Sequence, residues 1–176
     1  VAWICVAALV ALSLILSACQ PAAKGEKTVI TFIWTQEFDT LNPLYTNMWF
    51  VTVLYPIYEC QAWWFDEKNQ PIPSLVTEIP TLDNGGISAD GRTITLKLRD
   101  DIKWSDGKPI TSKDFKFTYE MTMADANAVS SRSPFDLVES FETPDERTVR
   151  VTFKEPYAPW LSRLFAGMGG AALLPE

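Results

Sequence analysis

One stretch, ADGRTITLKLRDDIKWSDGKPITSKDFKFTYE at residues 89–120, constrains the fold most, because it requires a strand, a turn and a helix in that order. Asp90-Gly91 predicts a turn, after which Ile94, Leu96 and Leu98 alternate with polar residues. Such alternation is typical of a strand with one buried and one solvated face. The stretch therefore indicates a mixed α/β fold.

The second half of this stretch gathers charges and hydroxyls, so it could be either a binding site or architecture. A short strand is expected at 103–104, followed by the turn pair Asp106-Gly107. Thr111 and Asp114 then have the S/T-x-x-D/E spacing of a capping box, in which a hydroxyl and an acidic side chain stabilise the start of a helix. Because each of these residues has a structural role, we expect the stretch to contact no solute.

The rest of the chain contains further strand, helix and turn signals. The pattern predicts strands at 28–34 and about 62–65, the latter with a turn at 67–70 and a proline-marked exit. It also predicts an uncharged helix within 45–58 that Pro56 kinks or ends, a hairpin at 136–153 with its turn at 143–146, a short helix after Pro159, and a last strand from 168.

Composition excludes several functions. The 176 residues contain no histidine, which excludes Ser–His and Cys–His catalysis and a histidine-bearing zinc site within them. The net charge of −7 and the lack of a basic run argue against nucleic-acid binding. The carboxylate pairs Asp66-Glu67 and Asp100-Asp101 are sequence neighbours on loops, an arrangement that does not favour a hydrolase pair. We expect no catalytic residue, no cofactor and no metal site.

The N-terminus predicts export. Residues 1–18 are uncharged and apolar, a length of roughly 18 residues that is borderline for a membrane span. The ending Leu16-Ser17-Ala18-Cys19 resembles the bacterial lipobox, in which a peptidase cuts before the cysteine and lipid is attached to its thiol. This resemblance makes 1–18 a lipoprotein signal peptide, Cys19 the lipidated residue and 19–27 a flexible tether. The alternative is a plain anchor helix with an incidental cysteine.

Cysteine use then leaves one thiol in the mature chain. Cys5 would leave with the signal peptide and Cys19 would carry lipid, so Cys60 has no disulfide partner. Because no histidine can activate it, we expect Cys60 to be a buried small hydrophobe rather than a nucleophile.

The order of these motifs resembles the family 5 solute-binding proteins of ABC importers, the oligopeptide- and dipeptide-binding proteins. The family pattern D-G-x-T, L-R, K-(F/W)-x-D-G-x-P-(F/V/I)-T and D-(V/F) corresponds to residues 90–93, 98–99, 103–111 and 114–115. Further matches are Leu41-Asn42-Pro43, Tyr58-Glu59, 73–76, 148–151 and 173–175. The sequence departs from the pattern at Cys60-Gln61, where the family has Gly-Leu, and at Ile79, where Trp is common.

The resemblance implies a periplasmic-binding-protein-like α/β fold of two lobes that close around a solute. Residues 28–176 would form only the N-terminal part of lobe one, with about 58–167 as its extra subdomain. We therefore expect both ends, Val1 and Glu176, to be cut from a longer protein.

By the same resemblance, the protein is a lipid-anchored monomeric receptor in the cell envelope, at the outer face of the plasma membrane or in the periplasm. It would capture oligo- or dipeptides and deliver them to a transmembrane permease and its ATPase subunits. The segment after the first strand reaches the ligand in this family, which makes Asn47, Met48 and Trp49 the ligand-binding candidates. The alternative places Met48 and Trp49 in a helix core.

Other functions stay open at this point. The same receptor fold could bind an oligosaccharide, nickel or another solute, or could act as a solute sensor. A lipid-anchored hydrolase is the most remote alternative.

Overall fold

The computed structural model describes residues 29, 31–166 and 172–176, and the chain divides into two units between Thr35 and Gln36. The predicted signal peptide and tether, with Cys5 and Cys19, lie outside the described residues. In the first unit, the described residues 29 and 31–35 are not in a strand, so the strand prediction for 28–34 is wrong there. A strand requires a neighbour for its backbone hydrogen bonds, and none of the described strands pairs with this segment.

The second unit is built on an antiparallel sheet in the order β3-β5-β4, formed by β3 (Thr93–Lys97), β5 (Thr148–Phe153) and β4 (Val138–Asp145). Ile94 lies opposite Val151 in this register, and both side chains are fully buried. The predicted alternation of β3 is therefore confirmed.

The β4–β5 hairpin is also present, but its turn lies later than predicted. β4 continues to Asp145, and the connection is Glu146-Arg147 rather than 143–146. The pairing register shifts between Glu142 and Asp145, a stretch that includes Pro144. Proline has no N–H to donate, so an irregularity lets the strand continue past it.

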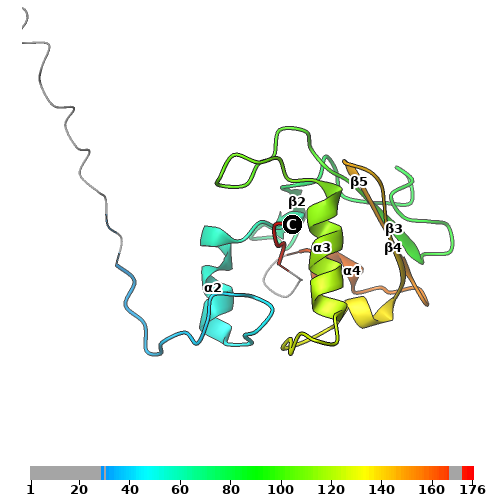
Figure 1. Cartoon of the computed structure of the whole chain (residues 1–176). Coiled ribbons are helices and arrows are strands. Elements are labelled where there is room, and N and C mark those ends of the chain that lie inside the picture. Colours follow the sequence, from blue (N-terminus) through cyan, green and yellow to red (C-terminus); the bar gives the residue numbers. More distant parts are fainter. Residues whose placement is uncertain (1–28, 30, 167–171) are drawn as a thin grey trace, which may run out of the picture. The chain divides into compact units, whose positions relative to one another are not determined.

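Helix α3 (Ser112–Met123) covers one face of this sheet (Figure 1). Its predicted capping box is confirmed: Thr111 Oγ1 accepts from the Lys113 N–H at 3.3 Å, and Asp114 Oδ2 accepts from the Thr111 N–H at 2.7 Å. Tyr119 then stacks on Phe141 of β4 at 4.8 Å between ring centroids. A local start signal and an aromatic contact thus fix the helix on the sheet.

A second, two-stranded sheet pairs β1 (Trp63–Phe65) with β2 (Pro71–Pro73). The predicted proline-marked exit is therefore itself a strand, and that prediction is wrong. In a two-stranded sheet each strand has an outer edge, where proline is tolerated. Trp63 is fully buried in the main core, whereas Trp64 packs against a different cluster, as alternation along a strand requires.

The remaining helices are α2 (Trp49–Tyr58), the 3₁₀ turn η1 (Phe135–Leu137) and α4 (Trp160–Arg163). α2 starts four residues later than the predicted range, and it ends two residues after Pro56. The strand predicted at 103–104 is only a single bridge between Lys103 and Pro109. Residues 172–176 are not in a strand, contrary to prediction, and 167–171 lie outside the described residues.

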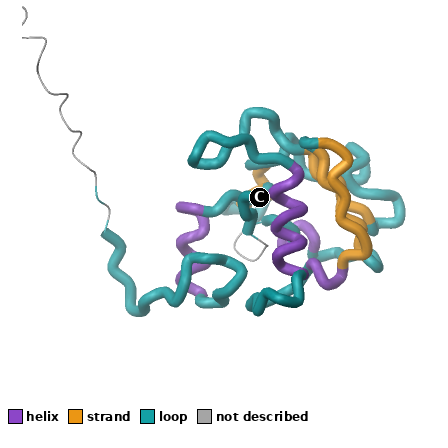
Figure 2. Tube along the Cα trace, in the orientation of Figure 1, coloured by secondary structure: helices purple, strands orange, loops and turns teal. Residues whose placement is uncertain are grey.

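The main hydrophobic core lies between the three-stranded sheet, α3 and residues 62–76, and a smaller cluster surrounds Phe50, Val51 and Tyr55 of α2. Figure 2 shows the three-stranded sheet on one side of α3 and α2 on the other. Within the described ranges, no helix combines the length and apolar character that membrane crossing requires.

Candidate functional site

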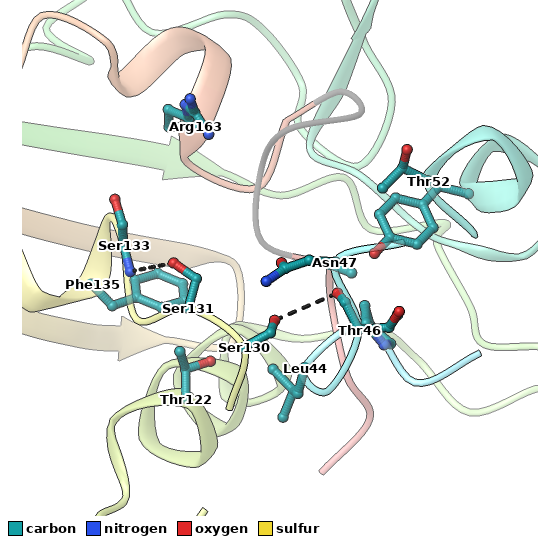
Figure 3. Close-up of a pocket in the computed structure, with 13 residues that line it drawn as sticks. Leu44, Thr46, Asn47, Thr52, Thr122, Ser130, Ser131, Ser133, Phe135 and Arg163 are labelled. Carbon is teal, nitrogen blue, oxygen red and sulfur yellow. Dashed lines mark hydrogen bonds between the residues drawn. The ribbon is translucent and has the colours of Figure 1, made fainter. Parts of the chain in front are cut away.

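A pocket of about 290 Å³ lies between α2, the end of α3 and the loops near them (Figure 3). Its lining is mostly polar and uncharged, with two aromatic rings and one arginine. The lining residues are Pro43, Leu44, Thr46, Asn47, Thr52, Tyr55, Thr122, Ser130, Ser131, Ser133, Phe135, Arg163 and Ala172.

The loop before α2 is shaped by its own short polar side chains. Asn42 Oδ1 accepts from the Leu44 N–H at 3.0 Å, and Thr46 Oγ1 accepts from the Met48 N–H at 3.1 Å. Such side-chain bonds to backbone two residues ahead are typical of turns that contain Asn or Thr. They lead the chain along the pocket and into α2.

A long-range contact closes this side of the pocket. The Ser130 N–H donates to the Leu44 carbonyl at 2.8 Å, and the Ser130 hydroxyl donates to the Thr46 carbonyl at 3.5 Å. Figure 3 shows the Asn47 side chain reaching across the pocket toward the serines of residues 130–133. Two loops far apart in sequence thus form facing walls.

The chemistry of the lining suits binding rather than catalysis. Hydroxyl and amide groups can donate and accept hydrogen bonds to a polar solute, and Tyr55 and Phe135 add apolar surface. Among the described lining residues, none is acidic and Arg163 is the one charged residue. The lining therefore lacks the carboxylate that a general acid or base would use.

The structure brings one of the three predicted ligand residues to this pocket. Asn47 is exposed and lines it. Met48 is half-buried and packs against the small cluster of α2, and Trp49 is 70% exposed at the start of the helix. Trp49 therefore does not lie in a helix core, whereas Met48 partly does.

Sequence reasoning missed the opposite wall, which consists of Thr122 and the serines of residues 130–133. The available signal was the run Ser130-Ser131-Arg132-Ser133, which follows α3 and looks like an ordinary polar loop. Nothing local indicates that Ser130 pairs with a loop 84 residues earlier in the chain.

The stretch 104–114 borders a second, wider hollow of about 420 Å³, together with Pro175 and Glu176. The two acidic side chains of the stretch itself, Asp106 and Asp114, are already engaged. Asp106 accepts from the Lys108 N–H at 3.0 Å, and this bond is the main cause of the lowered pKa of its carboxyl. Asp114 accepts from the Trp104 indole at 3.2 Å as well as from Thr111. These contacts agree with the expectation that this stretch is architectural. We therefore favour the first pocket as the candidate binding site.

The carboxylate pairs Asp66-Glu67 and Asp100-Asp101, considered above for a hydrolase, each contain a residue that is engaged in local contacts. Asp66 Oδ1 accepts from the N–H groups of Lys68 and Gln70 at 2.9 and 2.7 Å. Asp101 forms an ion pair with Arg99 at 2.6 Å, and the Arg99 side chain lowers the pKa of that carboxyl. Over the described part of the chain, no group of three His, Cys, Asp or Glu residues could hold a metal ion.

Residues 59–61 join α2 to β1 and contain three unusual groups. Burial raises the pKa of Glu59 to about 7. Burial, and then the charge of Glu59, also raises the pKa of the half-buried Cys60 thiol, which keeps it protonated and fits a packing role. Gln61 is fully buried, and its side-chain nitrogen and oxygen have no hydrogen-bond partner among the described residues.

Solved structures share this fold. AgaA of A. tumefaciens in complex with agropinic acid has a TM-score of 0.67 at 22% identity, covering 79% of this chain and 26% of that one. NikZ of Campylobacter jejuni in complex with Ni(L-His) has a TM-score of 0.63 at 26% identity, covering 80% of this chain and 26% of that one. Listeria monocytogenes OppA bound to peptide has a TM-score of 0.60 at 21% identity, covering 67% of this chain and 25% of that one. The fold is therefore part of a periplasmic binding protein, a class of solute receptor.

More narrowly, the chain belongs to the bacterial extracellular solute-binding proteins, family 5, because the family model of their middle region matches residues 70–173, more than half of the chain. A putative ABC transporter peptide-binding protein of Brucella ovis is 40% identical over 138 residues, covering 77% of this chain. The probable D,D-dipeptide-binding periplasmic protein of Escherichia coli is 29% identical over 139 residues, also covering 77%. The chain spans only 23% and 26% of these two relatives.

Proposed function

We propose that the whole protein is a lipid-anchored receptor of an ABC importer that captures short peptides and delivers them to a transmembrane permease. The observation that carries this proposal is the pocket beside the 43–47 loop, whose lining consists mostly of hydroxyl and amide groups and includes, among the described residues, the single charge of Arg163. Peptide backbones present N–H and C=O groups at regular spacing, and neutral polar groups can match them whatever the peptide sequence. The peptide-binding relatives of Brucella and Escherichia coli support the same solute class.

Asn47 is the contact residue that we propose first, with Met48 and Trp49 beside it. The carbonyls of Leu44 and Thr46 already accept from Ser130. A peptide that binds along this loop would therefore use the backbone and the side-chain amide of Asn47. Residues 58–167 would be the extra subdomain that carries the facing serines.

The solute class can be tested by thermal shift on the full-length mature protein, with di- to pentapeptides, oligosaccharides and Ni²⁺ with L-histidine as separate additives. A ligand at 100 times its Kd stabilises the folded state by about 2.7 kcal/mol, so a true ligand raises Tm. A shift with peptides alone supports the proposal. A shift with a sugar or with nickel alone, and none with peptides, would refute the peptide class but keep the receptor.

Asn47 can be tested on the same protein. Asn47→Ala should weaken peptide binding about 2- to 10-fold, the range expected for one hydrogen bond. Thr152→Val is the matched control, because Thr152 lies on β5 and does not line the pocket. Equal affinities for the Ala variant and the control would remove Asn47 from the site.

Membrane attachment and transport are separate parts of the proposal. Cys19→Ala should release the protein from membranes, whereas retention would favour a plain anchor helix. Peptide uptake that is lost on deletion of the receptor gene supports transport. Unchanged uptake, with a lost transcriptional response to peptide, would instead indicate a sensor. Turnover of peptides or glycosides by the purified protein would indicate a hydrolase.

A further inference from the structure

Helix α3 carries a buried polar stripe where an amphipathic helix normally places apolar residues. Asp114, Thr118 and Thr122 follow one another at four-residue spacing and are only 6%, 0% and 4% exposed. Buried polar groups need hydrogen-bond partners. The hydrogen-bond partners of these three side chains therefore indicate the role of the stripe.

Two of the partners are backbone amides of residues 172–176, which lie beside α3 in Figure 1. The Leu174 N–H donates to Thr118 Oγ1 at 2.9 Å, and the Glu176 N–H donates to Asp114 Oδ1 at 3.0 Å. The Thr118 hydroxyl also donates to the Asp114 carbonyl at 2.9 Å. Its hydrogen is therefore engaged within the helix, and a lone pair is available to Leu174.

The spacing of these two bonds matches the geometry of the two segments. Four residues of an α-helix rise by about 6 Å, and two residues of extended chain span about 6.6 Å. Alternate amides of residues 172–176 can thus meet every fourth residue of α3, in antiparallel order. The same spacing, extended by one step, would place Ala172 beside Thr122, and both of these residues line the 290 Å³ pocket.

We propose that Thr118 is a positioning residue for the pocket: its hydroxyl holds Leu174 and thereby sets the place of Ala172 in the pocket wall. Thr118 itself does not line the pocket, so it acts through the backbone of its neighbour. The inference rests on the proposed function to the extent that it assumes that this pocket receives the solute. It also gives Asp114 a second role, as the outer anchor of the same segment.

Thr118 allows a cleaner test than Asp114, because Asp114 also caps α3. Thr118→Val keeps the shape of the side chain but removes the acceptor, which leaves the Leu174 N–H without its partner. Thr118→Ser keeps the hydroxyl and should restore the contact. Thr152→Val is the control for loss of a hydroxyl elsewhere, since Thr152 Oγ1 lies 3.1 Å from Thr93 Oγ1 on the sheet.

The experiment uses the full-length mature protein and two measurements. Amide hydrogen exchange is followed in a peptide fragment that covers 172–176, and affinity is measured with a mixture of Ala-Xaa-Ala tripeptides. Thr118→Val should exchange about 10-fold faster there and bind the mixture about 5- to 10-fold more weakly, as expected for about 1–1.5 kcal/mol. Thr118→Ser and Thr152→Val should match the unsubstituted protein in both measurements.

Several results would overturn the inference. Unchanged exchange at 172–176 in Thr118→Val means that the hydroxyl holds nothing in place, and faster exchange with unchanged affinity means that the segment does not position the pocket. If the unsubstituted protein fails to bind the tripeptides, the proposed solute class fails. The inference is then decided by amide hydrogen exchange alone. In Thr118→Val, exchange must become faster both at 172–176 and in the facing wall at 130–133.

Discussion

Replacing Gln61 by methionine is expected to raise the free energy of unfolding of the full-length protein. The Gln61 side chain is fully buried, and neither its nitrogen nor its oxygen has a hydrogen-bond partner among the described residues. A buried amide left in this state costs about 1–3 kcal/mol. Methionine is likewise unbranched, fills irregular core space and carries no group that needs a partner.

The gain should therefore be about 1–3 kcal/mol, because most of the desolvation cost of the amide is removed and the packed volume is nearly kept. Urea unfolding monitored by tryptophan fluorescence measures it, as an increase in the midpoint at an unchanged slope. Gln61→Glu is the matched control: it keeps the shape, adds a charge at the same buried position, and should destabilise the protein strongly.

A lower unfolding free energy for Gln61→Met would refute this reasoning. It would mean that the amide is hydrogen-bonded in the full-length protein by a part of the chain that the described residues do not include. The sign of one measurement thus separates an orphaned amide from one that is hydrogen-bonded by a part of the protein outside the described residues.

Three further predictions concern single residues. Because burial raises the pKa of Glu59 from 4.5 to about 7, the folded state binds the proton more tightly than the unfolded state, so Tm should fall as pH rises from about 4.5 to 7; Glu59→Gln should flatten this part of a Tm–pH profile. Thr111→Ala should lower the unfolding free energy by about 1 kcal/mol through loss of the cap, and Thr111→Ser should not, in a paired urea titration. Gly107→Ala should lower the unfolding free energy by about 1–2 kcal/mol in the same assay, because the backbone φ of Gly107 is +89°. No atom lies within 4 Å of the added methyl group, so the cost comes from the backbone alone, and an unchanged midpoint would contradict this argument.

Features with a local cause could be predicted from the sequence. The Thr111–Asp114 capping box and the buried alternation of β3 both depend on spacing within a few residues. The family motifs of residues 90–115 are largely made of such signals. This explains why the fold class and the family could be predicted from the sequence together.

Features that depend on distant partners could not be predicted. The expected strand at 28–34 has the right residue types, but no described strand pairs with it. The pocket needs the bonds from Ser130 to the 43–47 loop, and hydrogen bonds between distant backbone groups leave no trace in local composition. Asn47 was predicted through family resemblance, whereas the serines opposite it had no comparable signal.

The strand order β3-β5-β4 has a consequence for the order of folding. β4 and β5 are joined by a two-residue turn, so their pairing closes a short loop, whereas Thr93 of β3 meets Thr152 of β5 across 59 residues. Closing a longer loop costs more chain entropy, and pairings of high sequence separation slow folding. The β4–β5 hairpin with α3 is therefore the natural nucleus, and β3 adds to its free edge last. Substitutions at the hairpin turn should slow refolding, and those in β3 should mainly speed unfolding.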